Sequence, residues 1–122
     1  MRLPAWYGVA VAILLFAQWG VFLATGNVPE LEDATREIAF HMSAEFVMAL
    51  VLLTGSIAIL RRKAWGAFVY LVGAGMVVYS VINSPGYFAE SGDWALVAMF
   101  MVLLVLTVCA VALVVRQLLR LR

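Results

Sequence analysis

The sequence has little charge and almost no cysteine, and these two shortages exclude several classes of protein. Charged residues make up 12% of the 122 positions, against about a quarter in a typical soluble domain. A formal net charge of +1 offers no basic surface for DNA or RNA, so we expect no nucleic-acid partner. The single cysteine, Cys109, cannot form an intramolecular disulfide.

The common signatures of catalysis are also missing. The chain has no glycine-rich phosphate loop and no GxSxG, CxxC or HExxH motif. Cys109 stands among apolar residues, where a thiol packs as a small apolar group more often than it reacts as a thiolate. The sequence therefore favours a non-enzymatic function.

What the chain does contain is long apolar runs, since 66% of its residues are hydrophobic. A helix needs roughly 20 mostly apolar residues to cross the hydrocarbon core of a bilayer, and a spanning segment without barrel-like alternation must be helical. Four runs meet this requirement: residues 3–25, 38–60, 64–84 and 94–115. The sequence predicts an all-α integral membrane protein, with residues 1–122 forming a single domain of four transmembrane helices bundled in up-down order within the lipid bilayer.

Short polar segments separate the four runs. Residues 26–37 and 85–93 form the longer connections, and the basic residues 61–63 leave room only for a tight hairpin between the second and third helices. Asp33 or Thr35 can cap the second helix, and residues 91–93 can cap the fourth. Proline at position 85 ends the third helix, because it disfavours helical geometry in the residue before it.

The charges are distributed unevenly along the predicted bundle. All seven acidic residues belong to one half, and seven of the eight basic residues sit at the opposite end. These basic residues are Arg2, Arg61, Arg62, Lys63, Arg116, Arg120 and Arg122. Lys and Arg in short flanking segments mark the cytoplasmic side. We therefore expect both termini in the cytoplasm, and the plasma (inner) membrane as the location.

Within the predicted spans, Glu45 is the one unambiguous charge. Ionisable groups at membrane depth are rare, face the bundle interior and are functional candidates by default. Glu37, His41 and Glu45 are spaced i, i+4, i+8, which places them on one helical face. At 1.5 Å per residue, Glu45 lies roughly 10 Å below the outer boundary of the span.

Other polar side chains occur at a matching depth. Gln18 on the first helix is near the level of Glu45, and Gly75, Tyr79 and Asn83 form a second i, i+4, i+8 stripe, with Ser80 adjacent. We expect a polar pocket in the outer leaflet, open to the outside and closed below by aliphatic residues. The candidate ion- or ligand-binding residues are Glu45, His41, Glu37, Gln18, Tyr79 and Asn83.

Two of the readings of this cluster do not involve a metal. In the first, a protonated Glu45 is hydrogen-bonded to Gln18 or Tyr79 and simply joins helices, for about 1–2 kcal/mol or less. In the second, Glu45 is the exchanging carboxylate of a proton- or cation-coupled site, with His41 as its relay at neutral pH.

A metal site is the third reading. Glu37, His41 and Glu45, completed by Glu90 or Asp93, make a carboxylate-rich shell suited to a divalent cation. One histidine is fewer than most zinc or iron sites use. Haem held by two histidines would require His41 from two subunits, so haem is the least favoured cofactor.

Two functional hypotheses follow. The first is a small transport or ion-binding protein, linked to protons or cations, with an outward-facing intramembrane site. The second is a non-catalytic accessory or assembly subunit of a larger membrane complex. Small residues in the third helix, among them Gly66, Gly73 and Gly75, favour close helix contacts within or between subunits. Because so small a chain encloses too little space for a wide pore, we expect a homo-oligomer or a partner membrane protein.

Overall fold

The computed structural model describes residues 1–24, 35–83 and 92–120, leaving out the side chains of residues 22, 23 and 35–39. Over this part the chain forms helices and no strand: α1 (Arg2–Ala24), α3 (Thr35–Leu60), α4 (Gly66–Asn83) and α6 (Trp94–Arg120). Each is long and apolar enough to cross a membrane. The predicted all-α, four-helix transmembrane fold is therefore confirmed, and length and composition identify the chain as a membrane protein.

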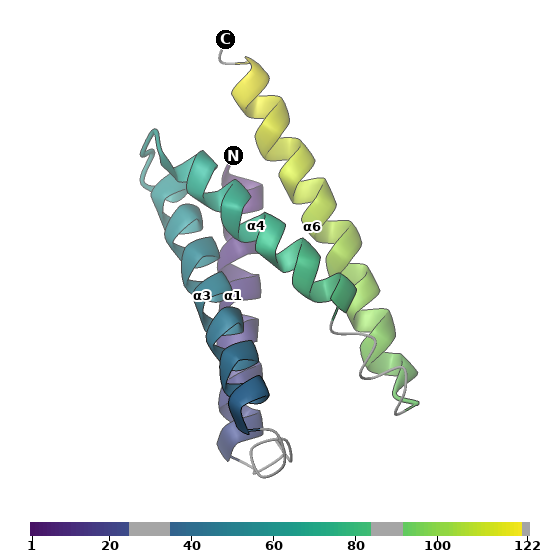
Figure 1. The fold of residues 1–122 in the computed structure, drawn as a ribbon. Helices are drawn as coiled ribbons and strands as arrows, with labels where there is room; N and C mark the ends of the chain where they lie inside the picture. The colour runs from purple at the N-terminus through teal and green to yellow at the C-terminus, as the bar shows by residue number, and fades with distance from the viewer. Residues whose placement is uncertain (25–34, 84–91, 121–122) are drawn as a thin grey trace.

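The helices alternate in direction, as the up-down prediction required (Figure 1). The N-terminus, the turn between α3 and α4 and the C-terminal end of α6 lie at one end of the molecule, which we call the basic end because it carries Arg2, Arg120 and residues 61–63. We call the other end, where α3 begins and α4 ends, the acidic end. The ends of α1 and α4 differ from the predicted spans by one or two residues. The larger differences are that α3 begins three residues earlier and that α6 continues five residues further, through Arg116 to Arg120.

The α3–α4 turn is closed by a Schellman motif. Arg62 has a φ of 59°, and its N–H donates to the Ile59 carbonyl at 3.0 Å, while Lys63 N–H donates to the Ala58 carbonyl at 2.9 Å. These two bonds satisfy carbonyls at the end of α3 that would otherwise have no partner. Glycine usually occupies the left-handed position, and an arginine there costs roughly 1–2 kcal/mol. The connection is a tight hairpin, as predicted, but it covers residues 61–65 and so extends two residues beyond the basic run.

Glycines bring α3 and α4 into backbone contact near the turn. A Cβ added at Gly73 would lie 2.7 Å from Leu52 Cα, and one at Gly55 would collide with the backbone of Tyr70. Small residues are the usual means by which membrane helices approach this closely. From this contact the two helices diverge toward the acidic end, so that they form a wedge (Figure 1).

Two tyrosine hydroxyls tie α1 to the later helices. Tyr70, which is fully buried, donates a 2.8 Å hydrogen bond from its hydroxyl to the Pro4 carbonyl. The Tyr7 hydroxyl lies 2.7 Å from Thr107 Oγ1 on α6. Helix α4 packs against α3 on one side and against α6 on the other. The outer face of α6 exposes apolar side chains, as expected of a helix facing lipid.

Candidate functional site

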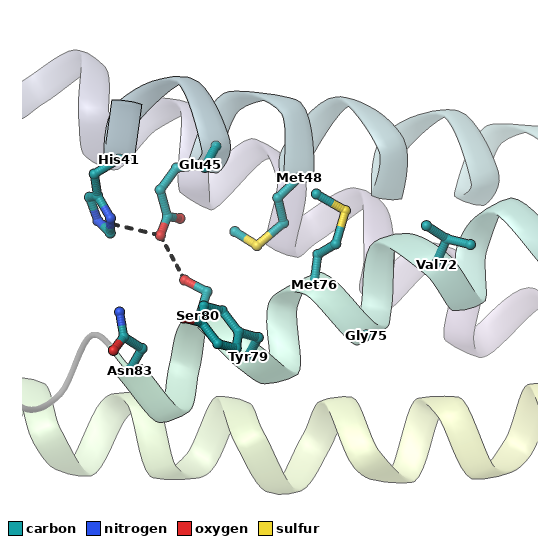
Figure 2. A pocket seen from close by; sticks show the side chains of 10 residues that line it. His41, Glu45, Met48, Val72, Gly75, Met76, Tyr79, Ser80 and Asn83 are labelled. Carbon is teal, nitrogen blue, oxygen red and sulfur yellow. Dashed lines mark hydrogen bonds and ion pairs between the residues drawn. The ribbon is translucent and has the colours of Figure 1, made fainter. Parts of the chain in front are cut away.

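A pocket of about 480 Å³ occupies the open part of the wedge between α3 and α4. Its size falls in the range of about 300–1,000 Å³ that is usual for small-molecule sites. Figure 2 shows the lining side chains projecting from the two helices into the space between them. The lining residues are His41, Ala44, Glu45, Met48, Val72, Gly75, Met76, Tyr79, Ser80 and Asn83.

Glu45 is the buried polar residue of this pocket, with 7% of its surface exposed. Ser80 Oγ on α4 donates a 2.7 Å hydrogen bond to Glu45 Oε1, and His41 Nε2, one turn earlier on α3, lies 3.6 Å from the same oxygen (Figure 2). The short bond across the wedge and the i, i+4 spacing along α3 hold the carboxylate in place. Both partners described for the carboxylate contact Oε1, and neither contacts Oε2.

An aromatic neighbour on α1 supports His41. The Trp19 ring lies edge-on to the imidazole, with ring centroids 5.9 Å apart. A second aromatic pair joins the same two helices, since Phe16 stacks on Phe46 at 5.8 Å. Aromatic pairs of this geometry contribute about 0.5–1.5 kcal/mol beyond the area they bury. Helix α1 therefore supports the site from behind, through rings.

Polar and apolar groups occupy different parts of the pocket. His41, Glu45, Ser80 and Asn83 belong to the acidic end, where Figure 2 shows the Asn83 amide pointing up between the helices. Toward the glycine contact the lining becomes apolar, with Met48 and Met76 lying between the two helices and Val72 beyond them. The pocket thus has a polar part and an apolar part, and the apolar part begins about one helical turn from Glu45 and Ser80.

The pocket opens on the side of the bundle. Tyr79 is 72% exposed and Val72 is 61% exposed, although both line the pocket. Gly75, between them, is exposed as well, and a Cβ added there would meet nothing within 4 Å. All three lie in α4, a helix long and apolar enough to span a membrane. Their exposed surfaces therefore lie within a segment that is able to span a membrane.

The structure brings together four of the six residues predicted for the binding site: His41, Glu45, Tyr79 and Asn83. Gln18, which is half-buried on α1, is not among the lining residues. The Glu37 side chain lies outside the described residues. Sequence reasoning placed Ser80 beside the site without giving it a role, and it missed Trp19. Trp19 could have been found from the sequence, because it follows Gln18, which was already placed near the level of Glu45 in the bilayer.

The structure describes only some of the side chains that the sequence predicted as metal ligands. Glu90 and the Glu37 side chain lie outside the described residues, and Asp93 is exposed at the start of α6. In residues 1–24, 35–83 and 92–120, no three His, Cys, Asp or Glu side chains are grouped so as to hold a metal ion. His41 and Glu45 are the two candidate ligands that this part of the structure brings into proximity.

Comparison with known proteins places the chain in one family. No curated protein and no solved structure matches it. The family described as "Domain of unknown function (DUF8058)" matches residues 1–121, which is nearly the whole length. The chain therefore belongs to this family.

Proposed function

We propose that this protein binds and transports a small cation or a cation-bearing solute, with Glu45 as the recognition group. The observation that carries the proposal is a carboxylate that is 93% buried and still lines a pocket large enough for a small molecule. A carboxylate used only to join helices would need no adjoining space. Intramembrane carboxylates commonly mark ion pathways and proton relays.

Charge complementarity supports a cationic ligand. The residues that line the pocket include no lysine and no arginine, so an ionised Glu45 has no permanently positive neighbour among them. A buried carboxylate without a counter-charge is unfavourable, and it is relieved by a proton, by a protonated His41 or by a bound cation. Exchange among these three states couples cation binding to proton release, with His41 as the relay at the mouth of the pocket.

Access from one side is part of the proposal. Backbone contact at Gly73 and Gly55 closes the wedge toward the basic end, and the pocket lies on the acidic side of that contact. Clustering of Lys and Arg at the basic end supports a cytoplasmic position for it and for both termini, in the plasma (inner) membrane. The pocket then faces the outer leaflet. Transport requires the contact between α3 and α4 to loosen, so that Glu45 becomes accessible from the other side.

A liposome flux assay tests this function. The purified full-length protein is reconstituted at matched amounts, and uptake is measured under proton, sodium, potassium and methylammonium gradients. We expect flux for at least one of these gradients and a loss of at least about tenfold for Glu45→Gln, because a hydrogen bond to a charged group is worth roughly 1.5–3 kcal/mol. Ser43→Ala is the matched control, since Ser43 is exposed on α3 and does not line the pocket.

The same variant separates transport from a packing role. Glutamine retains an oxygen that can accept the hydrogen bond from Ser80, so Glu45→Gln should unfold at nearly the wild-type temperature. If Glu45 served only to join helices in an accessory subunit, the wild type would carry no flux under any gradient. Equal flux through wild type and Glu45→Gln would also refute the proposed role of the carboxylate.

A further inference from the structure

We infer that the ligand of this pocket is a lipophilic amine: a protonated nitrogen head on a short apolar body, admitted from the bilayer through the opening between α3 and α4. The inference rests on the proposed role of Glu45 and adds the class of ligand and its route. It is carried by the order of groups along the pocket and by the exposure of its rim.

The polar part of the pocket fits a nitrogen head that donates several hydrogen bonds. Oε1 of Glu45 is engaged by Ser80 Oγ at 2.7 Å and approached by His41 Nε2 at 3.6 Å, whereas Oε2 has no partner in the described part of the chain. Asn83 lines the same end from the opposite helix, and turning over its amide, whose nitrogen points up between the helices in Figure 2, would bring its oxygen in as a second acceptor. An ammonium group has three N–H donors and no acceptor, which matches this set. A carboxylate or phosphate head would instead be repelled by Glu45.

The apolar part of the pocket makes a bare inorganic cation a poor match for the whole site. Met48, Met76, Val72 and Ala44 offer no charged or strongly coordinating group. Hard cations prefer shells of six or more oxygens, and the lining does not supply them. Methionine side chains adapt to apolar partners of irregular shape, so they suit a hydrocarbon body. A head at Glu45 and a body along Met48 and Met76 fill the pocket from one end to the other.

The rim indicates the route. Gly75 leaves a gap in the side of α4, and it is flanked by the exposed side chains of Val72 and Tyr79. Because α4 is long enough to span a membrane, this gap meets acyl chains rather than water over much of its length. An amphiphile dissolved in the outer leaflet reaches the pocket with its hydrocarbon already in lipid. The Tyr79 ring, at the rim near the headgroup level, can remain at the interface as aromatic side chains commonly do.

Photolabelling in liposomes tests the inference. The probe is a primary alkylamine of about ten carbons that carries a diazirine in its chain, and the chain-matched alcohol and carboxylic acid serve as comparison probes. The full-length protein is labelled in phosphatidylcholine vesicles at neutral pH, and adducts are mapped by mass spectrometry. We expect the amine to label the peptides containing Met48 and Met76 about tenfold more than either comparison probe does. We expect an excess of unlabelled decylamine to abolish that labelling.

Three variants locate the ligand. Glu45→Gln should reduce labelling by the amine about 10- to 100-fold and leave the weak labelling by the alcohol unchanged. Gly75→Leu should block the opening and abolish labelling. Its matched control is Gly20→Leu, because Gly20 also has open space around it but lies on α1, away from the pocket. Gly20→Leu should label like the wild type.

The outcomes distinguish this inference from the proposed function. Equal labelling by the three probes, or labelling of the wild type and Glu45→Gln to the same extent, would overturn the lipophilic-amine assignment. That result combined with Glu45-dependent flux of an inorganic cation would refute the ligand class and leave the transport proposal standing. Labelling that depends on Glu45 and Gly75, without flux under any gradient, would support the ligand class and refute transport.

Discussion

The pocket exists because α3 and α4 touch near their turn and separate beyond it, and two glycines in α4 test this geometry. A Cβ at Gly73 would lie 2.7 Å from Leu52 Cα and N, about 0.7 Å closer than the 3.4 Å at which ordinary contact begins. The nearest atoms belong to the backbone, so no side-chain rotation relieves the collision. Overpacking of this kind costs about 1–3 kcal/mol. Gly73→Ala should therefore destabilise the protein by roughly that amount.

Gly75, two residues away, supplies the matched control. An added Cβ meets nothing within 4 Å there, so Gly75→Ala introduces no clash. Replacing glycine by alanine in a helix also gains up to about 1 kcal/mol in helix propensity. We expect Gly75→Ala to be as stable as the wild type or slightly more stable. It should differ from Gly73→Ala by about 1–3 kcal/mol, because the gain in helix propensity is common to both variants and only the clash distinguishes them.

Unfolding in mixed micelles measures the difference. The protein is titrated from a mild detergent into sodium dodecyl sulfate, and the four tryptophans report unfolding by fluorescence. The free energy of unfolding is compared at one detergent composition, with refolding checked by reversing the titration. If Gly73→Ala proved as stable as Gly75→Ala, then α3 and α4 would not be in backbone contact at Leu52, and the wedge that forms the pocket would be refuted.

Two further predictions concern the hydrogen bonds of Tyr7 and Tyr70 and the side of the membrane on which the termini lie. Tyr70→Phe removes the hydrogen bond to the Pro4 carbonyl, and Tyr7→Phe removes the bond to Thr107; each should lower the free energy of unfolding by about 0.6–2 kcal/mol in the same titration. A loss below about 0.3 kcal/mol for both would contradict the described α1 contacts. For orientation, a cysteine added at either terminus in a Cys109→Ala background should react with a membrane-impermeant maleimide only after the cells are opened. Labelling of either terminus in intact cells would refute the cytoplasmic assignment.

The sequence predicted the four helices because spanning a bilayer depends on properties that are readable in one dimension. Length, hydropathy and the absence of charge decide whether a segment can cross, and backbone hydrogen bonding then makes it helical. The pairing of His41 with Glu45 was readable for a similar reason, since i, i+4 neighbours share a helix face whatever the rest of the fold does. The same spacing placed Gly75, Tyr79 and Asn83 on one face of the next helix, and all three line the pocket.

Gln18 was harder to place because the rotation of α1 is not encoded in its pattern. Apolar residues surround this helix on all sides, so no amphipathic face shows which side meets its neighbours. The rotation is decided by three-dimensional packing, in which Phe16 meets Phe46 and Trp19 meets His41. The glycines of α4 present the same difficulty. Spacing marked Gly73 and Gly75 alike as contact residues, yet Gly73 lies against Leu52 and Gly75 lies in open space.

The distance between the glycine contact and the carboxylate links packing to function. Ser80 follows Gly73 by seven residues, which is roughly 10 Å along the helix. A change of about 10° in the angle between α3 and α4 at the contact therefore moves Ser80 by about 2 Å, enough to break its 2.7 Å bond to Glu45. In the proposed transport cycle, a ligand head that binds at Oε2 and then displaces Ser80 from Oε1 would remove the bond that holds the wedge at its present width. Under the proposed function, occupancy of the pocket and the angle of α4 would thereby be coupled, as a transport cycle requires of this pair of helices.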